Sequence, residues 1–305
     1  MSTLKQIGEL GPSVLVHRLL HYPYVLGDQV FADYCDSPGT GAWGVMRFDL
    51  AAQRVSEQLD LNCGIESAQD GGAIPIAEGK ASLAVYASEV REALCIWNKQ
   101  DRSWRIHRRS PEGTALALGA APGSPWVSHL VETPAGFQLE LINVDAPGLG
   151  KTVSIAPFSG ATSVAVNSTL THFAIAHGGA LSCVRLNGAT EYAWPIDGPT
   201  YRLWFAEDDL AIFRTSSRAL TLHQFGGEVT RFELPNYRPR SMDLSSRSAL
   251  FHNYGTNEFV ELDLSTGRAR NTGQLPKGFL AVDLAARRLA LFSWERWTLS
   301  LFELP

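Results

Sequence analysis

The stretch from Met242 to Gly267, MDLSSRSALFHNYGTNEFVELDLSTG, decides the fold class. Near its end, Val260, Leu262 and Leu264 alternate with two acidic residues, so one side of an extended segment is apolar and the other is charged. A run of turn-forming residues, Ser265–Gly267, follows directly. The pattern predicts one arm of a β-hairpin. Similar short segments recur roughly every eight to twelve residues, with little helical periodicity, so we expect an all-β protein.

The same stretch contains a repeated motif. MDLSSR at 242–247 precedes Ala249–Phe251, and about 40 residues later VDLAAR at 282–287 precedes Ala290–Phe292. Looser copies begin at Trp204 and Val164. A repeat of about 40 residues that contains four strands is typical of one blade of a β-propeller. Seven such units fit the chain, with first strands expected near Tyr22, Ala73, Ala115, Thr162, Thr200, Arg238 and Gly278.

The two ends of the chain provide an independent indication. The last unit has only three expected strands and ends with Thr298–Leu304, whereas Leu4–Leu10 forms an additional strand ahead of the first unit. Pairing these two segments completes the last blade and removes an open sheet edge. We therefore predict a seven-bladed β-propeller in which the N-terminal strand completes the last blade, as one domain over residues 1–305.

Residues 242–267 are similar to the repeats of YVTN and lactonase-like propellers, and the expected closure resembles that of WD40-type rings. Most other units match these repeats poorly, and no tryptophan is followed by Asp, as the WD signature requires. The resemblance implies the propeller superfamily without identifying a specific family. It also implies an alternative function, a lactonase-like or other hydrolase with an acidic or metal-assisted site at the mouth of the channel.

The composition and net charge of the chain limit the kinds of molecule that it is expected to bind. The chain has 305 residues, 45% of them hydrophobic, and a formal net charge of −5. This charge disfavours nucleic acid and anionic membranes as partners. A basic tract around Trp104, from Arg102 to Arg109, is expected to be a solvated outer strand. Arg greatly outnumbers Lys, which suggests a bacterial source.

The expected cellular location and cofactors are inferred from motifs that the sequence lacks. The start lacks the apolar run of a signal peptide, and no later run is long enough to span a membrane. Cys35, Cys63, Cys95 and Cys183 are too widely separated for a zinc motif or a dense disulfide framework. His172 and His177 are expected on opposite faces of a strand. We expect a cytoplasmic protein with no metal or other cofactor.

Aromatic and arginine residues concentrate in the connections expected at one end of the blades, a combination enriched in protein interfaces. The predicted contact residues are Trp43, Arg91, Tyr201, Arg202, Arg214, Tyr237, Arg238, Arg240, Tyr254, Trp294, Arg296 and Trp297. They favour a noncatalytic interaction module, a scaffold or an inhibitor, that binds another protein. Alternatively, the aromatics pack between blades and the arginines are merely solvated, or the outer strands assemble with a partner.

The hydrolase alternative depends on acidic residues in the same connections. These are Asp36, Glu66, Asp70, Glu89, Glu132, Glu258 and Glu295. Nothing in their spacing pairs a general acid with a general base, and no G-x-S-x-G motif provides a serine nucleophile. We therefore assign no catalytic residue.

Overall fold

The computed structural model describes residues 4–11, 19–26, 29–35, 43–49, 51–60, 73–87, 93–107, 114–120, 125–146, 150–156, 158, 160–206, 211–275, 277–293 and 295–305. The regular structure in these ranges is entirely β-strand and forms seven four-stranded antiparallel sheets. The prediction of an all-β chain built from seven repeating units is confirmed. In the same ranges, no helix is long and apolar enough to cross a membrane.

Six of the sheets follow chain order. The first two contain β2 (Leu19–Leu26), β3 (Gln29–Cys35), β4 (Trp43–Asp49) and β5 (Arg54–Asp60), then β6 (Ala73–Glu78), β7 (Ser82–Ala87), β8 (Ala93–Asn98) and β9 (Ser103–His107). The third and fourth contain β10 (Thr114–Ala120), β11 (Trp126–Thr133), β12 (Gly136–Asn143) and β13 (Lys151–Ile155), then β14 (Ala161–Val166), β15 (His172–His177), β16 (Ala180–Arg185) and β17 (Thr190–Pro195). The fifth and sixth contain β18 (Arg202–Phe205), β19 (Ala211–Thr215), β20 (Ala219–Gln224) and β21 (Val229–Glu233), then β22 (Arg238–Asp243), β23 (Ser248–His252), β24 (Glu258–Asp263) and β25 (Arg268–Gln274).

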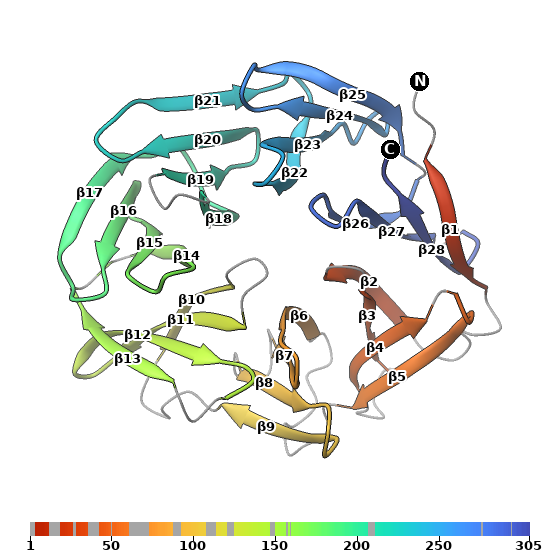
Figure 1. Ribbon diagram of the computed structural model, residues 1–305, viewed down its shortest axis with the longest axis horizontal. Helices are drawn as coiled ribbons and strands as arrows, with labels where there is room; N and C mark the ends of the chain where they lie inside the picture. The colour runs from red at the N-terminus through yellow and green to blue at the C-terminus, as the bar shows by residue number, and fades with distance from the viewer. Residues whose placement is uncertain are drawn as a thin grey trace. The chain divides into compact units, whose positions relative to one another are not determined.

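The seventh sheet departs from chain order. Its order is β1-β28-β27-β26, so that β1 (Lys5–Leu10) lies beside β28 (Thr298–Glu303), followed by β27 (Arg288–Ser293) and β26 (Phe279–Asp283). Figure 1 shows β1 in red next to β28 in dark blue. The prediction that the N-terminal strand completes the last sheet is confirmed. The seven expected first strands also begin within three residues of the observed ones.

The chain forms two compact units. The first comprises Met1–Pro75, Val85–Cys95 and Arg240–Pro305, and the second comprises Ile76–Ala84 and Ile96–Pro239. The sheets β10–β13, β14–β17 and β18–β21 lie wholly in the second unit. The expectation of a single domain over residues 1–305 stays a prediction.

In the first unit, β1 belongs to the hydrophobic core as well as to the hydrogen-bonded ladder. Leu10 is fully buried, pairs with Leu299 across the ladder, and packs in one cluster with Phe292 and Leu301. Ile7 lies at a register shift between Gln6 and Gly8 and is exposed. The strand is therefore joined to the last sheet by burial of apolar surface and by backbone pairing.

In the second unit, the middle strand β15 is buried on both faces. On β15, Phe173 and Ile175 pack into one apolar cluster, whereas Ala174 and Ala176 pack into another. Successive side chains of a strand point to opposite faces, so a strand covered on both sides is apolar throughout. This explains why such strands show a continuous apolar run instead of a simple alternation.

The repeated Asp-Leu motif forms the hairpin turns between strands. The Oδ1 atom of Asp263 accepts hydrogen bonds from the backbone amides of Ser265 and Thr266 at 2.8 and 3.1 Å, and these bonds lower the pKa of Asp263. Gly267 then adopts a left-handed conformation with φ of 68°. The same combination of Asp or Asn with a left-handed residue four positions later recurs at Asp49/Gln53, Asn98/Arg102, Asp243/Arg247 and Asp283/Arg287.

The role of β1 in stability can be tested at Leu10. We expect Leu10→Ala to lower the free energy of unfolding by about 2–4 kcal/mol, because it removes buried methyl groups and leaves a cavity. Ile7→Ala, on the same strand but exposed, is the matched control and should change it by less than about 0.5 kcal/mol. Urea denaturation followed by tryptophan fluorescence measures both. Equal effects of the two substitutions would contradict a core role for β1.

Candidate interaction surface

The structure describes most of the predicted contact residues. Arg91 and Trp294 lie outside the described residues, and for Trp43 only its place at the start of β4 is described. Among the described residues, five large apolar side chains are exposed: Ile7, Tyr201, Val229, Tyr254 and Trp297. All three aromatics in this set were predicted as contact residues, with exposed fractions of 62% for Tyr201, 49% for Tyr254 and 38% for Trp297.

Several predicted residues gather in the sheet β18–β21. Because its strands are antiparallel, the start of β18, the β19–β20 connection and the end of β21 share one end of the sheet. We call this the Tyr201 end. Of the predicted contact residues, Tyr201 and Arg202 lie at it, whereas Tyr237 follows β21 and Arg238 begins β22 of the next sheet. Arg218, in the β19–β20 connection, was not among the predicted contact residues. Tyr237 is half-buried, and the other four are exposed.

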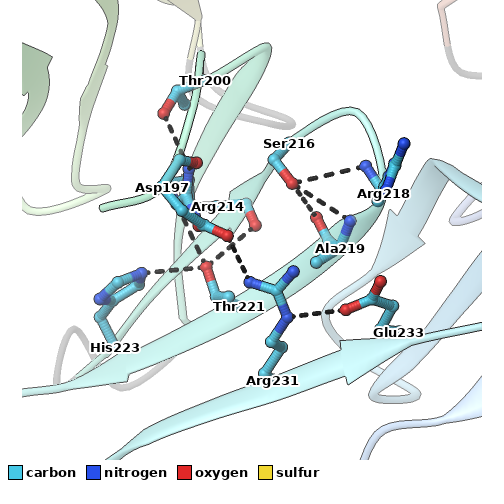
Figure 2. Close-up of polar contacts among 10 residues, drawn as sticks. All are labelled: Asp197, Thr200, Arg214, Ser216, Arg218, Ala219, Thr221, His223, Arg231 and Glu233. Atoms are coloured by element: carbon cyan, nitrogen blue, oxygen red, sulfur yellow. Dashed lines mark hydrogen bonds and ion pairs between the residues drawn. The ribbon is translucent and has the colours of Figure 1, made fainter. Parts of the chain in front are cut away.

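Arg214 is placed differently from what the sequence indicated. It was predicted as a contact residue, but only 1% of its side chain is exposed. Its guanidinium donates to Asp197 Oδ1 at 2.7 Å and to the Asp197 carbonyl at 3.2 Å. It also donates to Thr221 Oγ1 at 3.3 Å and to Thr200 Oγ1 at 3.5 Å, as Figure 2 shows. A buried charge requires a counter-charge and hydrogen bonds, and Arg214 obtains them from Asp197 and Thr200. Arg214 therefore anchors the loop before β18 instead of contacting a partner directly.

Asp197 joins this buried arginine to a second one at the surface. Its Oδ2 atom accepts a hydrogen bond from Arg231 Nη1 at 2.7 Å, and Arg231 Nε donates to Glu233 at 2.9 Å. The hydrogen bond from Arg231, with that from Arg214, lowers the pKa of Asp197, so it stays ionised. Tyr201 N donates to the carbonyl of Thr215 at 3.0 Å. The loop that carries Tyr201 is therefore held at both ends.

A neutral histidine completes the network. The side chain of His223 is buried, its Nε2 atom lies 3.0 Å from Thr221 Oγ1, and its ring meets Trp194 edge-on at 5.3 Å. Burial, together with the positive charge of Arg214, lowers the pKa of His223 to about 4. The Asp197 carboxylate therefore pairs with the guanidinium groups of Arg214 and Arg231, and the neutral His223 adds no further positive charge beside it.

In the first unit, Tyr254 is supported from two sides. The guanidinium carbon of Arg240 lies 4.4 Å from the centre of its ring, a cation–π contact. The buried ring of His252 lies 4.8 Å away, and burial lowers the pKa of His252 to about 4. Trp297 packs edge-on against the buried Phe292 at 6.0 Å. Tyr254 and Trp297 are therefore each partly exposed and each in contact with another side chain of the first unit.

The first unit also contains a polar cavity that the sequence analysis did not identify. Its volume is about 370 Å³, and it is lined by Asp243, Ser246, Glu261, Arg270, Asn271, Arg287 and Pro305. Arg287 Nη1 lies 3.0 Å from both carboxylate oxygens of the buried Glu261. Asp243 accepts hydrogen bonds from the hydroxyls of Ser245 and Ser246 at 2.7 and 2.6 Å. The sequence feature that could have pointed to this cavity is the repeated Asp-Leu motif, because Asp243 and Arg287 belong to two copies of it.

The residues considered for catalysis are described only in part. Asp36, Glu66, Asp70 and Glu89 lie outside it. Glu258 accepts a hydrogen bond from the Thr256 hydroxyl at 2.7 Å. His172 contacts Glu191 and His177 contacts Ser182, each at 2.9 Å, as expected for opposite faces of β15. No three His, Cys, Asp or Glu side chains are grouped as metal ligands within the described ranges.

Comparisons with known proteins identify the fold. The chain matches no protein-family model and no curated protein sequence. It is similar to the solved structure of the β-propeller domain of Cps50 (Swd1) from Myceliophteria thermophila, with a TM-score of 0.69 and 12% sequence identity. The match covers 99% of this chain and 100% of that one. At this identity the likeness concerns the fold, and the chain is a β-propeller.

The dependence of Arg214 on Asp197 can be tested by removing the carboxylate itself and, separately, its other partner, Arg231. We expect Asp197→Asn to destabilise the protein by about 1–3 kcal/mol, because a buried guanidinium loses its counter-charge. Arg231→Gln removes the half-exposed partner of the same carboxylate and should cost less than about 1 kcal/mol. Chemical denaturation at neutral pH compares the two. An equal or larger loss for Arg231→Gln would contradict the role assigned to Arg214.

Stability should also depend on pH below neutrality. The pKa values of His223 and His252 are about 4 in the folded protein and 6.5 without burial, so their contribution is complete above pH 6.5. As the pH falls from 6.5 to 4, only the unfolded chain takes up these protons, and stability decreases by on the order of 2 kcal/mol per histidine. His223→Asn should flatten this dependence in denaturation curves. An unchanged pH slope would show that His223 is not neutral in the fold.

Proposed function

We propose that this protein is a noncatalytic interaction module that binds another protein through loops at one end of its sheets, as a cytoplasmic scaffold or inhibitor. The observation that carries the proposal is Tyr201, a 62% exposed aromatic side chain on a loop anchored by the ion pair between the buried Arg214 and Asp197. Arg202 and Arg218 lie at the same end of the sheet. Tyr, Trp and Arg are the residues most enriched at the energetic centres of interfaces.

Rigidity is the physical reason why such a loop suits binding. Association loses free energy when side chains and loops must be ordered at the interface. At the Tyr201 end, the Asp197 carboxylate and the Tyr201 amide are already bonded to the sheet, so little further ordering is needed. A large aromatic side chain then contributes contact area at a small cost in conformational entropy.

Tyr254 and Trp297 extend the proposal to the first unit. Each is exposed on one side and supported on the other, Tyr254 by Arg240 and Trp297 by Phe292. Tyr254 follows β23, and Trp297 precedes β28. These positions correspond to the connection between the second and third strands of the sheet, which is also where Arg218 lies in the sheet β18–β21. The same type of connection thus carries a predicted contact residue, Tyr254 or Trp297, in two sheets and the exposed Arg218 in a third.

The proposal can be tested by affinity capture from cells of the source organism. Proteins retained by the wild type should be lost with Tyr201→Ser, by at least about tenfold for a residue at an energetic centre. Val229→Ser is the matched control. Val229 is 46% exposed and begins β21, at the opposite end of the same sheet, and its substitution should change nothing. Quantitative mass spectrometry measures the retained proteins.

Two outcomes would contradict the proposal. One is loss of the same proteins with Val229→Ser and Tyr201→Ser alike, since binding would then not depend on the Tyr201 end. The other is hydrolysis of a panel of lactones at a rate that survives Tyr201→Ser, which would favour the enzyme alternative. Circular dichroism of each variant establishes that the fold is retained.

A further inference from the structure

We infer that the polar cavity of the first unit binds a small organic molecule by its carboxylate group, which Arg270 and Arg287 hold. This inference goes beyond the proposed function, because the Tyr201 end belongs to the second unit. The cavity has a volume of about 370 Å³, within the range of small-molecule sites. Its lining comes from the sheet β22–β25, from the β26–β27 turn that carries Arg287, and from Pro305.

The buried carboxylate of Glu261 holds both arginines beside the cavity. Only 4% of the Glu261 side chain is exposed, and its Oε1 atom lies 3.0 Å from Arg287 Nη1 and 3.9 Å from Arg270 Nη1. Glu261 lies on β24, Arg270 on β25 and Arg287 in the turn between β26 and β27. A buried carboxylate requires cationic partners, so the fold itself brings two guanidinium groups to one place.

Most donors of these two guanidinium groups are not used within the protein. Arg287 donates to both oxygens of Glu261 from the single atom Nη1, whereas a side-by-side pair of arginine and carboxylate uses two nitrogens. Among the residues that the structure describes, no hydrogen bond involves Nε or Nη2 of Arg287. In the same part of the chain, Arg270 has only the 3.9 Å ion pair. Donors that line the cavity therefore remain for a ligand.

The acidic side chains of the lining, in contrast, already accept hydrogen bonds. Asp243 Oδ1 accepts from the amide and the hydroxyl of Ser245 at 2.9 and 2.7 Å, and its Oδ2 accepts from the hydroxyl of Ser246 at 2.6 Å. Glu261 accepts from Arg287 with both oxygens. The unused capacity of the cavity thus lies mainly in donors, so the ligand must supply acceptor oxygens.

The charges favour a ligand group with one negative charge. Around Glu261, two guanidinium groups face one carboxylate, an excess of one positive charge. Burial raises the pKa of Asp243, but hydrogen bonds from Ser245 and Ser246 outweigh it and lower this pKa, so Asp243 adds a negative charge to the lining. A doubly charged phosphate or sulfate would exceed the positive charge beside Glu261. A carboxylate matches it and can accept two parallel hydrogen bonds from a guanidinium.

Matched acids and amides test the ligand class. The probes are glycolate, lactate and glycerate, each compared with its uncharged amide in saturation-transfer NMR titrations of the full chain. We expect at least one acid to bind at least about tenfold more tightly than its amide, with affinity that falls as sodium chloride is raised. Equal affinity within every pair, or no binding of any acid, would overturn the inference. Tighter binding of inorganic phosphate than of all three acids would also overturn it.

A lysine substitution separates binding from support of Glu261. Arg287→Lys keeps the positive charge and one nitrogen for Glu261 but removes the remaining donors. We expect acid binding to weaken at least about tenfold, whereas the urea midpoint stays unchanged. Arg288→Lys is the matched control, because Arg288 pairs with Glu303 at 3.7 Å and does not line the cavity. Full acid binding by Arg287→Lys, or equal weakening by both variants, would contradict the assignment.

A second pair of variants decides the question if Arg287→Lys is unstable. Arg270 is half-exposed and lies 3.9 Å from Glu261, so Arg270→Gln should keep the fold and weaken acid binding at least about fivefold. Arg268→Gln removes the same charge from an exposed position on the same strand, β25, outside the cavity, and should leave binding within about twofold. Equal effects of these two substitutions would show that total charge, and not the cavity, attracts the acid.

Discussion

Each sheet of this protein requires four strands, and only the first strand of the chain is available to complete the seventh sheet. The pairing of β1 with β28 meets that requirement, and it joins residues 298 positions apart, from Lys5 to Glu303. Leu10 makes the pairing part of the core, because it packs with Leu299, Leu301 and Phe292. Without β1, the edge of β28 would expose unpaired backbone groups and an apolar face.

A second constraint shapes the candidate surface, namely the burial of the Arg214 guanidinium. A charge removed from water requires a carboxylate and hydrogen bonds, and these come from the loop that precedes β18. The stabilising network therefore also sets the position of Tyr201. His223 remains neutral below it, which preserves the Arg214–Asp197 pair from a competing positive charge. The contacts between Arg214 and the loop before β18 thus both stabilise the fold and hold Tyr201 at the surface.

Much of the candidate site could be predicted from residue types in the connections, and part of it could not. Tyr201, Tyr254 and Trp297, which the sequence places in connections between strands, are exposed, and their role as contact residues stays a prediction. Arg214 lies near the end of β19 in the same region, yet it is buried and forms an ion pair with Asp197, which precedes β18. The polar cavity around Glu261 was not predicted, because Asp243 and Arg287 belong to turns about 40 residues apart that meet only in the folded chain.

The sequence by itself determined the all-β class, the number of repeating units and the pairing of the two ends. These features depend on local patterns, period-two alternation and Asp-containing turns, which act over a few residues. Only the tertiary structure decided which arginines face solvent and which are held inside, and which histidines stay neutral. Those outcomes depend on the distance to a counter-charge and on the exclusion of water, and both are set by residues far apart in the chain.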